Sequence, residues 1–157
     1  MKNLVLYFSV YGTAKIVAEE IAKQTGAELV EIEPAVPYDS NRDHYNALAA
    51  YAKKEHDEDQ RPAIKNEINV DAYDTIYIGY PMWWYTFPMI IYTLFDKYDF
   101  SGKTIILFAT SGGSGMGNSA KELHPSVSDS AVIKDGKRFS ANASVSELKE
   151  WVNSFGI

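Results

Sequence analysis

The chain has 157 residues, of which 15 are basic and 21 acidic, so its formal net charge is −6 at pH 7. This length is close to the common size of one folded domain, and we expect a single domain over residues 1–157. The sequence contains no cysteine, which excludes disulfides, thiolate nucleophiles and cysteine-bound metal centres. The negative charge and the lack of a basic cluster argue against nucleic acid and anionic membranes as partners.

Leu4–Phe8 is an unbroken apolar run, which predicts a strand that is buried on both faces. A helical period begins at Thr13 and ends before Gly26. The predicted buried stripe of this helix is Ile16, Val17, Ile21 and Ala22. Residues 28–33 alternate acidic and apolar side chains, as expected for a strand near a sheet edge. The chain therefore opens with a strand, a helix and a second strand.

The connection over residues 34–70 is too long for a structureless loop in a compact domain, so it should contain a helix. Asn41 is the predicted N-cap of this helix. Its predicted buried stripe is Tyr45, Leu48, Tyr51 and Ala52. Residues 53–59 are rich in charge and are interpreted as its solvated end.

The segment between Asp74 and Asp96 carries no charge and is long enough to suggest a transmembrane helix. Pro81 and Pro88 interrupt it, however, and acidic rather than basic residues stand at its ends. We expect a strand at 75–79, a loop, and a helix with Pro88 in its first turn that runs to residue 98. The N-terminal apolar run is too short for a signal peptide, so a cytoplasmic protein without a membrane segment is expected.

The remaining pattern predicts a strand at 104–109, a short helix from about Asn118, and a brief strand at 131–133. Ser144 and Glu147 have capping-box spacing and open a last helix. Its predicted inward residues are Val145, Leu148, Val152 and Phe155, with Trp151 packed beside them. Five strands that alternate with helices predict an α/β fold, with a parallel sheet and helices on both faces.

Ligands of such sheets bind outside the carboxyl ends of the strands, where three loops stand out. The first loop leads into a helix whose free N–H groups can hold a phosphate. Its residues are Ser9, Val10, Tyr11, Gly12, Thr13 and Ala14. A plain tight turn with a helix cap at Gly12 or Thr13 is the alternative. The nucleoside-triphosphate loop pattern is not present.

The second loop is aromatic and lies between two prolines. Its candidate residues are Pro81, Met82, Trp83, Trp84 and Tyr85. Adjacent tryptophans cannot both point into one core, so we expect a flat apolar ligand here, with gap filling or a partner-binding patch as alternatives. The third loop follows the fourth strand and is rich in glycine, which lets the backbone approach a ligand closely. Its candidate residues are Thr110, Ser111, Gly112, Gly113, Ser114 and Gly115.

Several segments resemble the flavodoxins, in particular short bacterial flavodoxin-like proteins with a Trp-Trp loop. The segments are Tyr7–Ser9 with Gly12, Ala18–Ala22, Tyr73–Trp84, Tyr98–Lys103 and Phe108–Gly113. The resemblance implies a three-layer sandwich with strand order 2-1-3-4-5, which binds flavin mononucleotide (FMN) at the switch point. The family's phosphate loop resembles S-x-T-G-N-T, whereas this chain has Tyr11, Thr13 and Ala14 where the pattern has Thr, Asn and Thr. We therefore expect FMN binding with fewer hydroxyl donors to the phosphate.

The resemblance implies that the cofactor performs the redox chemistry and that no side chain is a catalytic acid or base. Trp83, Trp84 or Tyr85 would stack on the flavin, and residues 110–114 would line its other face. Three functions stay open: an electron carrier between redox partner proteins, a small FMN-dependent NAD(P)H:quinone-type oxidoreductase, and a flavin-free interaction module. We expect a monomer or a weak homodimer. The three histidines have no metal-ligand spacing, so no metal site is predicted.

Overall fold

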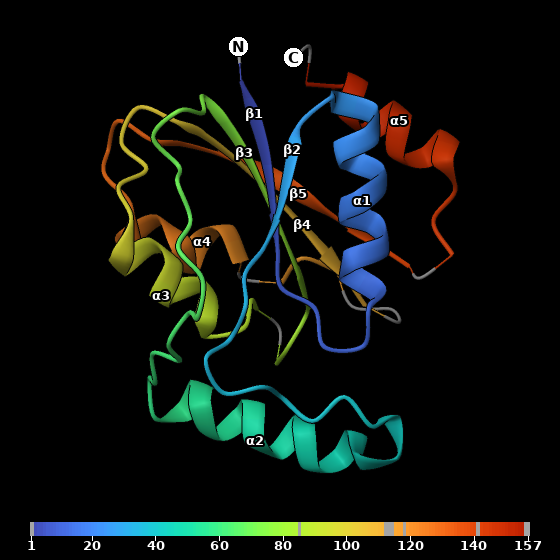
Figure 1. The fold of residues 1–157 in the computed structure, drawn as a ribbon, viewed down its shortest axis with the longest axis vertical. Helices are drawn as coiled ribbons and strands as arrows, with labels where there is room; N and C mark the ends of the chain where they lie inside the picture. The colour runs from blue at the N-terminus through green and yellow to red at the C-terminus, as the bar shows by residue number, and fades with distance from the viewer. Residues whose placement is uncertain (1, 85, 112–114, 118, 141, 156–157) are drawn as a thin grey trace.

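The computed structural model of the chain describes residues 2–84, 86–111, 115–117, 119–140 and 142–155. Its strands are β1 (Asn3–Tyr7), β2 (Glu28–Glu31), β3 (Thr75–Pro81), β4 (Thr104–Thr110) and β5 (Val132–Phe139). They form one parallel sheet in the order β2-β1-β3-β4-β5 (Figure 1). The predicted fold class and strand order are confirmed.

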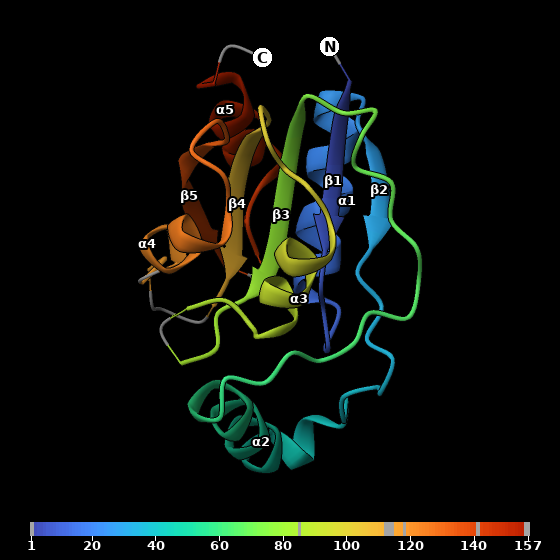
Figure 2. The ribbon, with the colours of Figure 1, turned by 90° about the vertical axis from the view of Figure 1, so that its left-hand side faces the viewer.

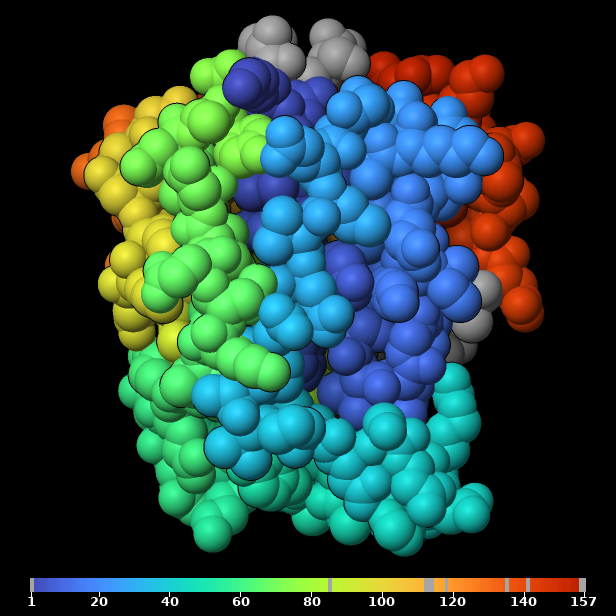
Figure 3. Space-filling view, in the orientation of Figure 1, coloured from blue at the N-terminus to red at the C-terminus, as the bar shows by residue number. Residues whose placement is uncertain are grey.

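The helices lie in two layers, with one exception. They are α1 (Thr13–Thr25), α2 (Tyr45–Asp57), α3 (Ile90–Lys97), α4 (Ser119–Leu123) and α5 (Val145–Asn153), with short 3-10 turns η1 (Arg42–His44) and η2 (His124–Ser126). Figures 1 and 2 show α1 and α5 on one face of the sheet and α3 and α4 on the other. Helix α2 covers neither face, because it lies across the edge where the strands end. In the space-filling view it closes the lower end of the molecule (Figure 3).

The two faces of the sheet carry separate apolar cores. Alternate residues of β1 divide between them, since Leu4 and Leu6 pack toward α3 whereas Val5 and Tyr7 pack toward α1 and α5. Trp151 of α5 belongs to the second core, which confirms its predicted packing role. Burial on both faces explains why the central strands are continuous apolar runs.

Several residues differ from the predicted burial. Ile16 is 63% exposed and Val145 is 56% exposed, because each lies beside the stripe that its helix turns toward the sheet. In α2, Leu48 and Ala52 are buried as predicted, whereas Tyr45 and Tyr51 are exposed and Glu55, predicted to be solvated, is only 3% exposed. The reason is that α2 packs against loops at the strand ends and not against a sheet face.

Several elements begin or end at residues other than those predicted. Strands β3 and β4 continue to Pro81 and Thr110, β2 stops at Glu31, and α3 begins at Ile90 rather than near Pro88. Helix α4 is described from Ser119, since Asn118 lies outside the described residues. Strand β5 is much longer than the predicted 131–133.

The length of β5 was hidden by its polar sequence. As the edge strand it is partly exposed to solvent, so it does not need a continuous apolar run. Its register with β4 shifts between Ile106 and Phe108. Gly136 lies at this irregularity, where an added Cβ would come within 2.0 Å of the Leu107 carbonyl oxygen. The glycine therefore permits a close backbone approach inside a strand.

Candidate functional site

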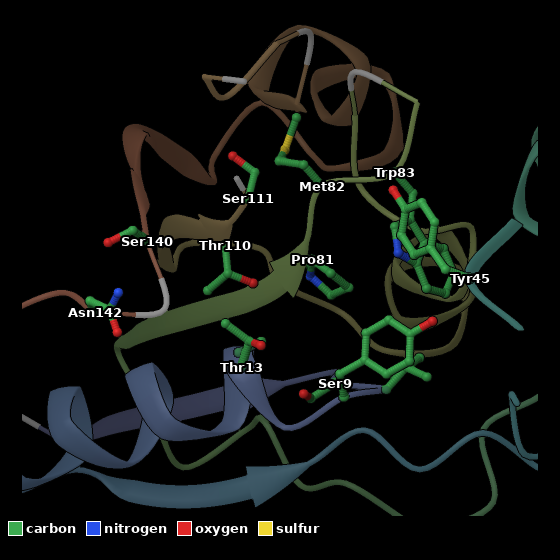
Figure 4. Close-up of a pocket in the computed structure, with 13 residues that line it drawn as sticks. Ser9, Thr13, Tyr45, Pro81, Met82, Trp83, Thr110, Ser111, Ser140 and Asn142 are labelled. Carbon is green, nitrogen blue, oxygen red and sulfur yellow. The ribbon is translucent and has the colours of Figure 1, made fainter. Parts of the chain in front are cut away.

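A cavity of about 520 Å³ opens at the carboxyl edge of the sheet. It is lined by Ser9, Val10, Tyr11, Thr13, Ala14, Tyr45, Pro81, Met82, Trp83, Thr110, Ser111, Ser140 and Asn142. Figure 4 shows Trp83 and Asn142 on opposite sides of the hollow, with Thr13 and Thr110 facing each other across it. This size is typical of small-molecule sites. All three predicted loops contribute to the cavity.

The loop after β1 presents the N-terminus of α1 to the cavity. Gly12 has φ +91°, in the left-handed region, and its N–H donates to Ser9 Oγ at 2.9 Å. The first hydrogen bond inside the helix runs from Ile16 N–H to the Gly12 carbonyl at 3.1 Å. The N–H groups of residues 13–15 therefore have no acceptor among the described residues. Free N–H groups and the helix dipole make this end of the cavity suited to an anion.

The loop after β3 separates its two tryptophans. Backbone bonds between Trp83 and Thr86, at 3.0 and 3.3 Å, close a tight turn. The Trp83 ring lines the cavity and meets Phe8 edge-on, with 5.5 Å between centroids. Trp84 turns toward α2, where its Nε1 donates to the Ala49 carbonyl at 2.9 Å. Only Trp83 is thus a wall of the cavity, and Tyr85 lies outside the described residues.

The loop after β4 is held by an arginine from β5. Arg138 donates from Nε to Ser111 Oγ at 3.1 Å and from Nη2 to the Ser111 carbonyl at 3.0 Å. Thr110 and Ser111 line the cavity, whereas Gly115 does not. The predicted residues 112–114 lie outside the described residues. Arg138 thus places a positive charge directly behind the cavity wall.

Sequence reasoning missed Tyr45, Ser140 and Asn142 as lining residues. The sequence predicts Tyr45 in a buried stripe, whereas its place in the cavity depends on where α2 packs. Ser140 and Asn142 follow β5, whose predicted end came several residues too early. The rule that ligands bind at strand carboxyl ends would have found them if the length of β5 had been recognised.

Neighbouring ionisable groups are perturbed, but none of the described acids lines the cavity. Burial raises the pKa of the Glu55 carboxyl on α2, although its hydrogen bond from Tyr38 acts in the opposite direction. Burial and the same bond raise the pKa of the Tyr38 hydroxyl. Within the described ranges, no cluster of His, Asp and Glu is suited to hold a metal ion. No helix in the described part of the chain has both the length and the apolar character to cross a membrane.

The chain is similar to known proteins over nearly its whole length. The model of the flavodoxin family matches residues 2–155. A putative flavoprotein from Bacteroides eggerthii is 35% identical, with a TM-score of 0.86 over 99% of this chain and 98% of that one. One from Bacteroides uniformis is 36% identical, with a TM-score of 0.85 over 97% of both chains.

A more distant match has a bound cofactor in its crystal structure. A flavoprotein from Lactobacillus acidophilus, solved in complex with FMN, is 25% identical, with a TM-score of 0.74 over 96% of this chain and 97% of that one. The search of curated proteins gave no match.

Proposed function

The chain belongs to the flavodoxin family, and from this premise we propose that it binds FMN in the cavity and carries electrons between redox partner proteins. The observation that carries the proposal is the convergence of three strand-end loops on one cavity of about 520 Å³. An anion-binding helix end forms one side of this cavity, and an aromatic ring forms another. The FMN complex of the related Lactobacillus acidophilus flavoprotein supports the choice of cofactor.

The helix end fits a phosphate group despite its unusual sequence. Gly12 holds the left-handed conformation that turns the chain into α1, and the N–H groups of residues 13–15 remain available. Ser9 Oγ accepts from Gly12 N–H, so its own hydroxyl proton can be donated to a ligand. Thr13 offers a second hydroxyl beside the cavity. Tyr11 and Ala14 do not replace the hydroxyls of the family pattern, and each lost bond to a charged phosphate costs about 1.5–3 kcal/mol.

The other end of the cavity fits a flat ring. Trp83 is fixed by edge-on contacts with Phe8 and with Tyr38, whose centroids lie 5.5 and 5.4 Å away. A ring that is already immobilised loses little entropy on stacking. Thr110 and Ser111 form the opposite wall, and the hydrogen bonds from Arg138 hold that wall in place.

FMN supplies the electron-transfer chemistry when bound, and the protein binds and orients it. The positive charge of Arg138 lies close to the cavity and favours electron gain there. The net charge of −6 favours docking of basic redox partners, since complementary charge speeds association. A flavin-free interaction module would have no reason to retain this anion-binding end beside an aromatic wall.

The proposal is tested by titrating the purified protein with FMN and following flavin fluorescence and visible absorbance. We expect saturable 1:1 binding. Trp83→Leu should weaken it about 5- to 10-fold, because stacking contributes about 1 kcal/mol. Trp84→Leu is the matched control and should leave FMN affinity unchanged, since this ring lies outside the cavity. The absence of saturation at about 100 μM FMN would overturn FMN binding.

Electron carriage is tested on the FMN-loaded protein under anaerobic conditions. Chemically reduced protein should pass electrons to a basic haem protein such as cytochrome c, at a rate that falls with ionic strength. NADH and NADPH should not reduce the bound flavin. Rapid reduction by either nucleotide would contradict the carrier and favour the reductase.

A further inference from the structure

A second pocket, of about 320 Å³, lies between α2 and the loop after β3. Leu48, Ala49 and Ala52 of α2 form one wall, and Trp84 forms the facing wall. We call it the α2 pocket. Helix α2 lies across the strand ends and not on a sheet face (Figure 1), and apolar side chains of α2 line this pocket beside the loop after β3.

The α2 pocket adjoins the proposed FMN cavity. Tyr11, Tyr45, Met82 and Trp83 line both spaces. A molecule in the α2 pocket would therefore lie next to the contents of the cavity, with shared side chains between them.

The lining of the α2 pocket selects an uncharged ligand. No charged side chain lines it among the described residues, and the Trp84 indole N–H is already bound to the Ala49 carbonyl at 2.9 Å. The Tyr11 hydroxyl, in contrast, is buried without a hydrogen-bond partner in the described part of the chain. Leaving such a group unpaired costs about 1–3 kcal/mol. Because Tyr11 lines the pocket, a shift of its side chain that exposes the hydroxyl would let it donate to a carbonyl oxygen on a ligand.

The aromatic wall is held under backbone strain. Trp84 has φ +54°, a left-handed conformation that costs a bulky residue about 1–2 kcal/mol. The hydrogen bond to Ala49 ties this conformation to α2, and Lys53 Nζ lies 5.8 Å from the centre of the indole ring. The Trp84 ring thus lines the α2 pocket and is not part of the lining of the cavity.

We infer that the α2 pocket binds a flat, uncharged aromatic molecule that carries a carbonyl oxygen, such as a quinone, beside the FMN cavity. The inference rests on the proposed function, because it identifies a small-molecule partner for the same redox site. Flat rings match the tryptophan and tyrosine walls, and the absence of charge matches the apolar side of α2.

The test uses 1,4-naphthoquinone as the probe and equilibrium dialysis against FMN-loaded protein. We expect saturable 1:1 binding without release of FMN. Ala49→Leu fills the pocket and should weaken probe binding at least 10-fold. Ala50→Leu makes the same change on the exposed side of the same helix turn and should have no effect. Neither variant should change FMN affinity by more than about twofold.

A second variant covers the case in which Ala49→Leu disturbs folding. Trp84→Leu removes the exposed indole wall and should weaken the probe at least fivefold while FMN affinity is kept. Three results would overturn the inference. They are probe binding that does not saturate, equal probe affinity in Ala49→Leu and Ala50→Leu, and displacement of FMN by the probe. If FMN itself fails to bind but the probe binds and responds to Ala49→Leu, the α2 pocket stands and the proposed function falls.

Discussion

Replacing Tyr38 with Phe should remove one hydrogen-bonded contact that attaches α2 to the rest of the molecule. The Tyr38 hydroxyl lies 2.9 and 2.8 Å from the two carboxyl oxygens of Glu55, and Glu55 is only 3% exposed. The substitution keeps the ring, whose edge-on contacts with Phe8 and Trp83 have centroid distances of 5.4 Å. The substitution therefore removes the hydroxyl while the aromatic packing of the ring is kept.

The expected cost follows from the single hydroxyl proton, which makes the equivalent of one hydrogen bond to a buried carboxylate. Such a bond contributes about 1.5–3 kcal/mol, so we expect the free energy of unfolding to fall by about 2 kcal/mol at pH 7.5. For a chain of this length, that loss lowers Tm by roughly 4–8 °C.

The loss should also depend on pH, because the hydroxyl bonds more strongly to the charged form of Glu55. Burial raises the pKa of Glu55 in the folded protein above its ordinary value of 4.5, while the bond from Tyr38 lowers it. Removing the bond raises that pKa further. An acid whose pKa is raised on folding stabilises the fold at low pH, and this contribution is lost as pH rises through the folded pKa. The penalty of Tyr38→Phe must therefore grow as pH rises through the folded-state pKa of Glu55, which lies above 4.5.

The assay is urea unfolding followed by circular dichroism at pH 5.5 and pH 7.5. Tyr73→Phe is the matched control, because Tyr73 also donates to a glutamate, Glu28, but on the exposed surface. Exposed pairs contribute little, so this variant should lose no more than about 1 kcal/mol at either pH. The reasoning is refuted if Tyr38→Phe costs under about 0.5 kcal/mol, or if its cost is the same at both pH values.

Two further predictions concern residues that support the cavity. Gly12→Ala should weaken FMN binding about 5- to 30-fold, since a side chain at φ +91° adds about 1–2 kcal/mol of backbone strain. Gly26→Ala is the control, because Gly26 has φ +69° at the far end of α1. This variant should lower Tm but leave FMN affinity unchanged in the same titration. Arg138→Gln should lower the reduction midpoint potential of the bound flavin by about 40 mV, because losing a unit positive charge beside the cavity wall disfavours electron gain by on the order of 1 kcal/mol. Lys137→Gln makes the same charge change on the next residue, whose ammonium pairs with an exposed glutamate at 3.5 Å, and an equal shift in both variants would contradict the role of Arg138.

Local patterns predicted the central fold because the central strands are buried on both faces. Leu4–Phe8 and residues 105–109 are apolar apart from the Tyr7 hydroxyl, so strand and burial on both faces follow from each run. Strand β5 is stabilised by a single neighbour and tolerates polar residues such as Lys134 and Arg138, so no apolar run marked its length. Edge position is a property of the assembled sheet and cannot be seen in a short window.

The sequence likewise predicted part of the candidate site and missed the part that depends on tertiary packing. The loops after β1, β3 and β4 were found because strand ends of a parallel sheet lie at one edge. The role of Tyr45 and the burial of Glu55 were not, because both depend on where α2 docks. That position is set by contacts between distant segments, such as Tyr38 with Glu55 and Trp84 with Ala49. The charged sequence around Glu55 also suggested a solvated helix end.

The two pockets depend on the position of α2 to different extents. The phosphate end of the cavity is built on β1 and α1, which pack into the sheet and do not depend on α2. Helix α2 forms one whole wall of the α2 pocket, whereas it contributes Tyr45 to the lining of the cavity. A change that loosens α2, such as Tyr38→Phe, should therefore reduce the affinity for the naphthoquinone probe more than the affinity for FMN. By linkage, a ligand that binds only when α2 is docked must in turn stabilise the docked helix, so the probe should restore part of the stability that this substitution removes.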